Sequence, residues 1–441
     1  MSDRGHIKLG AFLHATGHHV AGWRAPAAQA DAGVNLRHYL DMAVDAERAG
    51  YDMIFLADTL MVKPGSLDTM SRIARYTALF EPLTLLSALA VVTRNIGLVA
   101  TATTTYNEPF HVARKFASLD LISGGRAGWN LVTSANPAEA GNFGGHAHPL
   151  HAERYERARE FHKVVLGLWN SWEDDAFSYD KESGQYFDPA KLHALEHEGK
   201  HFQVRGPLNA ARSPQGHPIV VQAGSSPAGR ALAAETAEVV FTAETDLERA
   251  RAFYADVKGR MPAFGRDPEH LKIMPGVYAV VGRSEAEARE KNDQLQRLIE
   301  PAVGLSILGE MLGTDLSGHP IDGPLPDIPT TNGGKGRQEV VLALARRENL
   351  SIRQLYTAIA GARGHLTVCG TASQVADVLE TWFKTEAADG FNVMPPSLPD
   401  GLTDFSELVI PELRRRGLFR ERYEGSTLRE NLGLPIPTFK R

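Results

Sequence analysis

Short apolar runs alternate along the chain with longer stretches in which apolar residues recur at helical spacing. This alternation is typical of βαβ units that build a parallel sheet. Two runs, IGLVATATT and HPIVVQAG, are nearly continuously apolar, as strands buried on both faces should be. Eight parallel strands with helices between them predict a (β/α)8 TIM barrel. The predicted strands are Ile7–Leu13, Asp52–Ala57, Ile96–Thr103, Ala127–Thr133, Pro218–Gln222, Val239–Thr242, Ile273–Val281 and Phe391–Met394.

The helical stretches have recognisable starts and stops. Residues 36–49 carry apolar residues at helical spacing and stop at Gly50, a residue suited to the left-handed position after a helix. Pro109 begins a second helix, which ends at Gly124. A third is expected over 151–172. An open, doubly wound sheet is the alternative architecture, but no GxGxxG follows the first strand, which disfavours it.

Two segments interrupt the repeat. Residues 170–212 are polar and too long for an ordinary loop, and residues 303–335 are dense in Gly, Pro and Asp. Insertions in a barrel usually lie over the C-terminal ends of the strands and shape the pocket. We therefore expect a single domain, 1–441, with both insertions over that rim. A passive surface excursion or an oligomer contact is the alternative for each.

Composition and charge narrow the class of protein. The 441 residues include 47 Lys and Arg against 53 Asp and Glu, a net charge of −6, without the basic balance of nucleic-acid binders. No run approaches the roughly 18 apolar residues that cross a bilayer. Cys369 is the only cysteine, which excludes an intramolecular disulfide and a multi-cysteine metal site. A cytoplasmic enzyme with no nucleic-acid or membrane partner is the expectation.

Polar residues stand at successive predicted strand ends, where barrel enzymes carry their functional groups. Any one of them could simply satisfy its own loop, but their recurrence at one rim indicates a site. They are His14, Asp58, Thr103, Thr104, Asn130, Thr133, Ser134, Ser225 and Ser226.

The segment QAGSSPAGR after the fifth strand predicts an anion site. Gly224 permits a tight turn and Pro227 suits the first turn of a helix, so backbone N–H groups and both serine hydroxyls could meet a phosphate. An ordinary serine N-cap is the alternative.

His151 and Tyr155 lie four residues apart and so share one helix face. They could bind the ribityl chain or phosphate of a flavin. The alternative is a solvated helix start, with Arg154 and Arg157 paired to Glu153.

No protein nucleophile is evident. GxSxG and GxxxxGK[ST] are absent, and the histidines 193, 197 and 201 repeat every four residues without forming HExxH, which favours a solvated face over a metal site. This suits an enzyme whose cofactor performs the chemistry. His14 and Asn130 are the candidates for any catalytic side chain.

Several long segments resemble the bacterial luciferase-like flavin monooxygenases, in the branch of nitrilotriacetate monooxygenase component A and dibenzothiophene-sulfone monooxygenase. They keep the family's order over nearly the whole chain, and include YDMIFLADTL, GGRAGWNLVTS, HAERYERAREF and HPIVVQAGSS. The resemblance implies a barrel that binds reduced FMN (FMNH2) at the C-terminal rim. The implied contacts are Asp58 and Thr104 beside the isoalloxazine ring, Asn130 at its polar edge, His151 and Tyr155 at the ribityl chain and phosphate, and Ser225 and Ser226 at the phosphate.

The resemblance also implies a separate NAD(P)H:flavin reductase that supplies FMNH2, and oxidation of a small organic C–N, C–S or sulfur substrate by O2 through a C4a-peroxyflavin. A homodimer or homotetramer is implied too. The alternatives are an F420-dependent dehydrogenase of the same superfamily and a non-catalytic flavin-binding protein. The substrate is left open: Arg24 and Lys63 could attract a carboxylate, or could be solvated surface charges.

Overall fold

The computed structural model describes residues 5–62, 66–144, 147–329 and 335–439. Within these ranges a parallel sheet closes into a barrel in the order β1-β2-β3-β4-β7-β8-β9-β11, with β11 pairing back to β1. The barrel strands are β1 (Lys8–Phe12), β2 (Met53–Leu56), β3 (Gly97–Thr103), β4 (Ala127–Val132), β7 (Ile219–Gln222), β8 (Val239–Thr242), β9 (Lys272–Gly282) and β11 (Gly390–Val393). The predicted barrel and its eight strands are confirmed.

One further strand of the sheet, β10 (Leu366–Thr371), was not predicted. It pairs in parallel with the far half of β9, from Leu366 opposite Val277 to Thr371 opposite Gly282. β9 is 11 residues long and extends beyond its barrel partners, so its end has room for this extra strand. Only two of the six residues of β10 are buried, and its sequence, LTVCGT, lacks the continuous apolar run by which the barrel strands were predicted.

The helices that cover the barrel begin and end largely where the local signals placed them. α1 (Leu36–Ala49) ends at Gly50 with φ +98°, and α4 (Pro109–Ser123) ends at Gly124 with φ +71°. α5 stops three residues before its expected end. The remaining helices around the barrel are α3 (Pro82–Val92), α5 (His151–Trp169), α6 (Pro227–Thr236), α7 (Leu247–Arg260), α8 (Glu285–Arg297), α12 (Ala372–Lys384), α13 (Asp400–Asp404) and α14 (Ile410–Arg415).

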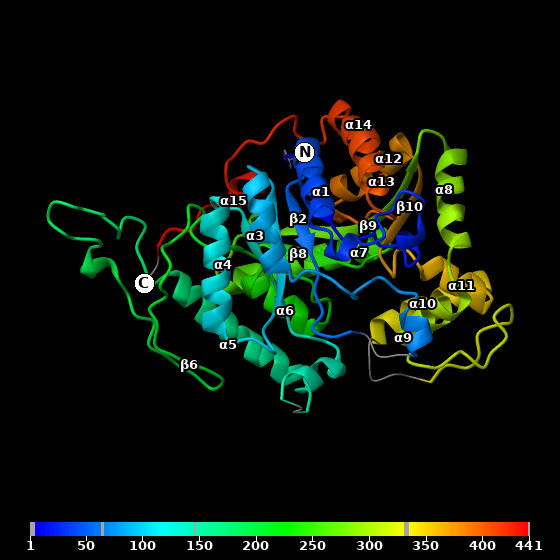
Figure 1. Cartoon of the computed structure of the whole chain (residues 1–441), viewed down its shortest axis with the longest axis horizontal. Helices are drawn as coiled ribbons and strands as arrows, with labels where there is room; N and C mark the ends of the chain where they lie inside the picture. The colour runs from blue at the N-terminus through cyan, green and yellow to red at the C-terminus, as the bar shows by residue number, and fades with distance from the viewer. Residues whose placement is uncertain (1–4, 63–65, 145–146, 330–334, 440–441) are drawn as a thin grey trace.

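The N-terminal ends of the strands, here called the base, are closed by the short helix α15 (Leu428–Asn431), shown in red in Figure 1. Leu428 and Leu432 are fully buried with the apolar side chains of the barrel strands. A Cβ on Gly97 would lie 2.4 Å from Leu428 Cδ1, so glycine in β3 makes room for this leucine. The base is therefore a packed plug, and the opposite end, the rim, is left for function.

The first insertion, residues 170–212, does not lie over the rim as expected. It follows α5, and helices in such a barrel run back towards the base, so the insertion starts there. It returns along α5 as a short hairpin, β5 (His197–Glu198) with β6 (Gln203–Val204), where the Glu160 carboxylate accepts from the backbone N–H of Phe202 at 2.9 Å. In Figure 1 its outer loop extends at the left, away from α9 at the lower right.

The second insertion is longer than the predicted 303–335, because α9 (Pro301–Leu312) packs with two further helices, α10 (Lys335–Glu348) and α11 (Ile352–Ile359). These pack together through buried side chains such as Leu308, Val341 and Leu355. α9 also contacts α2 (Leu67–Met70), which follows β2. Residues 330–334 of the expected insertion, like Lys63, lie outside the described residues. None of the described helices combines the length and the apolar character needed to cross a bilayer.

Candidate active site

A cavity of about 1530 Å3 lies at the rim. The loops that follow β2, β3, β4 and β7 form one side of it, and α2 and α9 form another. Small-molecule sites usually enclose roughly 300–1,000 Å3, so this cavity has room for a cofactor and a substrate together.

Of the seven predicted FMN contacts, three lie on the wall of this cavity: Asp58, Asn130 and Tyr155. They come from the ends of β2 and β4 and from the first turns of α5, far apart in the sequence. The other predicted strand-end residues on the wall are Thr103, Thr133 and Ser134. Gly224, in the turn after β7, lies beside Tyr155: a Cβ on Gly224 would lie 3.2 Å from Tyr155 Oη and 2.9 Å from Gly229 Cα. Only a glycine lets this turn approach α6 and Tyr155 so closely.

Asn130 presents an unsatisfied acceptor to the cavity. Its Nδ2 donates to Thr101 Oγ1 at 2.8 Å, and the Thr101 hydroxyl donates to the Leu56 carbonyl at 2.8 Å. These bonds orient the amide, and Asn130 Oδ1 is left buried with no hydrogen-bond partner among the described residues. A buried polar atom without a partner costs about 1–3 kcal/mol, so an N–H donor on a ligand would stabilise this site.

Asp58 has an unusual acidity. Burial raises its pKa to about 6, while the backbone N–H of Thr59 opposes the shift and the carboxylates of Glu81 and Glu139 add to it. Glu139, in the 3-10 helix η3 (Pro137–Asn142), is a site residue that the sequence did not reveal. Its Oε1 accepts from Thr59 Oγ1 at 3.2 Å, and its Oε2 is buried without a partner among the described residues.

The two serines at the start of α6 differ in their surroundings. Ser226 is the N-cap, and its Oγ accepts from the backbone N–H of Gly229 at 3.1 Å. Ser225 is exposed, and its carbonyl accepts from Arg230 Nε at 2.9 Å. The structure thus shows an ordinary N-cap at Ser226, beside the Gly224 turn; an anion there stays a prediction.

Thr104, His151 and His14 are not on the wall of the large cavity. The buried Thr104 hydroxyl donates to the Val132 carbonyl at 3.2 Å, and its neighbour Thr103 lines the cavity instead. His151 is exposed, with its ring 4.8 Å from that of Tyr155.

His14 is buried beside the rings of Phe12 and Tyr76, each about 5.2 Å away between centroids. Burial first, and then the nearby His18 and Arg75, lower its pKa well below 6.5. Its imidazole is therefore neutral in the physiological pH range, and it supports the loop around Tyr76 from behind the cavity.

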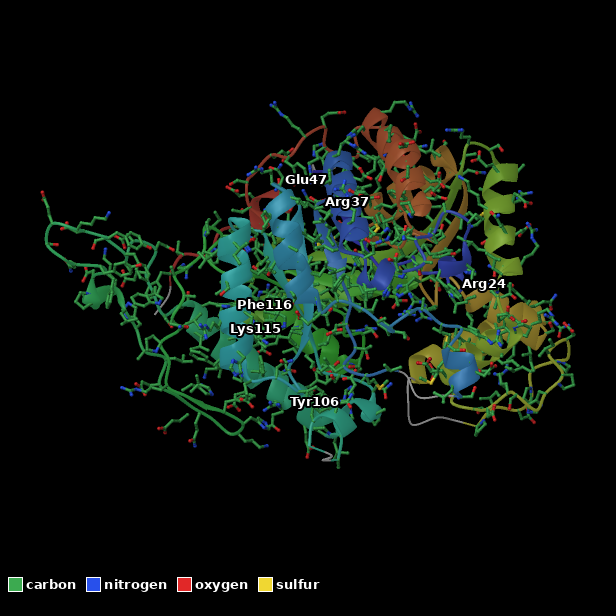
Figure 2. The ribbon with its side chains drawn as sticks, viewed as in Figure 1. Arg24, Arg37, Glu47, Tyr106, Lys115 and Phe116 are labelled. Carbon is green, nitrogen blue, oxygen red and sulfur yellow. The ribbon has the colours of Figure 1, made fainter. Side chains whose placement is uncertain are left out.

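The first three residues of α5, 151–153, are exposed, but the two arginines that follow bond to the barrel loops. Arg154 is buried, and its Nη1 donates to the Ser134 carbonyl at 2.9 Å and contacts His148 Nε2. His148 Nδ1 in turn lies 2.7 Å from the Tyr106 hydroxyl; Tyr106 is labelled in Figure 2 at the foot of α4. The alternative pairing of Arg154 with Glu153 is wrong, because this guanidinium ties together the loops after β3 and β4. Arg157 likewise donates to backbone carbonyls of the loop after β3.

The histidine repeat and Arg24 make local contacts instead. His193 Nε2 pairs with Glu173 at 2.9 Å and His197 Nε2 with Glu160 at 3.1 Å, so the evenly spaced histidines do not converge. Arg24, beside the second insertion in Figure 2, pairs with Glu300 at 3.0 Å.

The cavity lies at the rim of a (β/α)8 barrel, where enzymes of this fold bind their ligands. The unpaired amide oxygen of Asn130 and the glycine turn at Gly224 are features of a cofactor-binding enzyme of this class. The chain belongs to the luciferase-like monooxygenase family, whose model matches residues 14–388. The chain is thus an enzyme, the oxygenase component of a two-component, flavin-dependent monooxygenase.

Individual relatives cover almost the whole chain. It is 53% identical to the N-acetyl-S-(2-succino)cysteine monooxygenase of Bacillus subtilis (strain 168), over 99% of this chain and 98% of that protein. It is 52% identical to nitrilotriacetate monooxygenase component A of Aminobacter aminovorans, over 98% and 97%. Among solved structures, a long-chain alkane monooxygenase superposes with a TM-score of 0.85 at 34% identity, covering 97% of this chain and 95% of that one.

Proposed function

We propose that this oxygenase binds reduced FMN, supplied by a separate NAD(P)H:flavin reductase, and uses it with O2 to oxidise a small organic substrate. The observation that supports this most directly is the rim cavity, where the Gly224 turn and Tyr155 meet at the start of α6 while Asn130 Oδ1 has no partner. A homodimer or homotetramer, as the resemblance implies, is part of the proposal.

The residues present fit a flavin mononucleotide. The start of α6 offers backbone N–H groups and the favourable end of the helix dipole to a phosphate, and Gly224 allows the close approach. Ser225 and Tyr155 would add hydroxyl donors there, with His151 against the Tyr155 ring. Asn130 Oδ1 would accept from the polar edge of the ring system.

The flavin, when bound and reduced, supplies the electrons that activate O2. The chain's own residues bind and orient the reactants and exclude water. Asp58, with its pKa raised to about 6, can hold a proton on its carboxyl group close to neutral pH. We assign Asp58 and the rim threonines, Thr103 on the wall and Thr104 behind it, to the surroundings of the ring. Leu305 and Leu316 of the second insertion add apolar wall, which keeps the site dry.

Anaerobic titration of the purified protein with FMNH2 tests the cofactor. We expect binding, and turnover of a substrate with 18O2 only when a reductase or photoreduced FMN is present. Full turnover with NADH and FMN but no reductase would contradict the two-component proposal. Binding and turnover with reduced F420 in place of FMNH2 would favour the dehydrogenase alternative.

Two variants test the phosphate site. Tyr155→Phe and Ser225→Ala should each weaken FMNH2 binding about tenfold, the effect of losing one hydrogen bond to a charged group. Tyr186→Phe, an exposed tyrosine of the first insertion, is the matched control and should bind as the wild type does. If both test variants bound FMNH2 with unchanged affinity, the assignment of the flavin phosphate to this turn would be wrong.

The substrates named for the relatives differ widely. N-acetyl-S-(2-succino)cysteine and nitrilotriacetate carry several carboxylates, whereas a long-chain alkane carries no charge. One fold therefore serves both, and the side chains of the cavity must decide between them.

A further inference from the structure

We propose that Arg75 and Arg363, on the wall of the rim cavity, together bind a carboxylate group of the organic substrate. The inference rests on the proposed function, because it places this group beside the flavin in the same cavity. The proposed function does not specify the charge of the substrate or the side chains that select it, and this inference names both.

Arg75 lies in the loop between α2 and α3 and lines the cavity. Its guanidinium stacks over the ring of Tyr76, 4.5 Å from the centroid, and its Nη2 donates to Tyr76 Oη at 2.9 Å. Its Nε is buried and has no hydrogen-bond partner among the described residues. The side chain is thus held in place by its contacts with Tyr76.

Arg363 follows α11 and lines the same cavity. Its Nη2 donates to His18 Nδ1 at 2.8 Å, and its Nε, like that of Arg75, is buried without a partner among the described residues. His18 can accept this bond because its Nε2 donates to the Phe12 carbonyl at 2.8 Å. Burial, the largest effect, lowers the pKa of His18 well below 6.5, and Arg75 lowers it further. His18 is thus a neutral imidazole that accepts from Arg363 and is close enough to Arg75 to be affected by its charge.

Neither guanidinium makes an ion pair with a carboxylate of the described residues. Buried arginines at the base are treated differently: Arg429 pairs with Glu238, and Arg420 with Asp52. A partly desolvated charge without a counterion is unfavourable, and two of them on one wall are more so. A bound anion would stabilise both.

A carboxylate fits this wall best. The planar guanidinium matches a carboxylate with two parallel hydrogen bonds. The bonds to Tyr76 and His18 use Nη2 of each arginine, so Nη1 has no hydrogen bond to another described residue. The flavin phosphate has its own place at the start of α6. Backbone conformation points the same way: Tyr76, with φ +59°, and Arg363, with φ +50°, lie in the left-handed region, and such strain gathers at ligand sites.

Calorimetric titration of the FMN-loaded protein tests the proposal with defined probes. These are nitrilotriacetate, N-acetyl-S-(2-succino)cysteine and succinate, each compared with its methyl ester. We expect at least one acid to bind, with its ester about tenfold weaker or more, as for the loss of a charge-assisted hydrogen bond. If no acid of the panel binds more tightly than its ester, the carboxylate site is wrong.

Arg75→Gln and Arg363→Gln should each weaken binding of that acid about tenfold, and the double variant about a hundredfold, with the affinity for FMN unchanged. Arg72→Gln, an exposed arginine paired with Asp68 outside the cavity, is the matched control. Acid binding that survives in both test variants would overturn the proposal.

Loss of FMN binding in the variants would assign the arginines to the flavin instead and would also overturn it. Failure of the wild type to bind FMN at all would reject the proposed function, a separate outcome. If Arg363→Gln does not fold, Arg75→Gln decides alone, because the hydrogen bond of Arg75 among the described residues goes to Tyr76, its neighbour in the same loop.

Discussion

The two ends of the barrel differ in how their buried charged groups are paired, although a few polar atoms at the base, such as Arg420 Nε, also lack a partner among the described residues. At the base, Arg429 pairs with Glu238, Arg420 pairs with Asp52, and Arg126 donates five hydrogen bonds to the backbone and side chains around it. At the rim, several polar atoms on or behind the cavity wall have no partner among the described residues, including His14 Nε2, Arg75 Nε, Asn130 Oδ1, Glu139 Oε2, Thr314 Oγ1 and Arg363 Nε.

This difference indicates that the buried groups at the base stabilise the fold, whereas those at the rim are available to bind a ligand. Each partnered group at the base links segments far apart in the chain, such as Arg429 and Glu238, 191 residues apart. Unpartnered groups at the rim reduce stability unless a ligand completes them. Changes at the base should therefore alter unfolding, and changes at the rim should alter binding.

The largest effect is expected at the base. Glu238→Ala removes the partner of Arg429, and breaking a buried ion pair costs about 3–5 kcal/mol of unfolding free energy. The measurement is urea unfolding of the apo protein. Arg297→Ala, which removes an exposed pair with Glu290, is the control and should change stability by less than about 1 kcal/mol. If both changes lowered the free energy of unfolding equally, the ion pair at the base would not be a special source of stability.

The pH dependence of this pair follows from the same contacts. Burial alone would raise the pKa of Glu238, but Arg429 and His217 overcome it and lower the pKa to about 2. The stabilisation is therefore complete above the unfolded pKa of about 4.5 and is lost as the pH falls towards 2. The Glu238→Ala variant should lack this part of the acid transition.

An intermediate effect is expected at the glycine turn of the rim. In Gly224→Ala the new Cβ would lie 2.9 Å from the Gly229 backbone, so the turn must move and FMN binding should weaken about ten- to hundredfold. Gly259→Ala, in α7 with nothing within 4 Å of the added carbon, is the control. Full FMN affinity in Gly224→Ala would show that the turn is not a flavin contact.

The smallest effect concerns Asp58. Because burial raises its pKa to about 6, the folded state disfavours the ionised form, and the cost appears as the pH rises from the unfolded value of 3.8 through 6. Asp58→Asn should raise stability by about 1 kcal/mol at pH 8, after allowance for solvent screening, and by nothing at pH 4. Melting temperatures at the two pH values measure this; an equal gain at both would reject the shifted carboxyl.

The sequence by itself determined the architecture, because its signals are local or periodic. Eight apolar runs predicted the eight barrel strands, and Gly50 and Gly124 marked helix ends that only a glycine adopts easily. Strand ends also predicted Asp58 and Asn130 on the cavity wall, since parallel strands bring their carboxyl ends to one rim. Tyr155 needed the family resemblance as well.

Only the tertiary structure decided the contacts between distant segments. Arg363 and His18 are 345 residues apart, and no spacing announces their hydrogen bond. Glu139 stands in a 3-10 helix that no sequence pattern indicated, and β10 pairs with the extra length of β9. The hairpin of the first insertion lies beside α5, where it bonds to Glu160. Local propensity cannot encode such contacts, since they depend on which loops the closed barrel brings together at its rim.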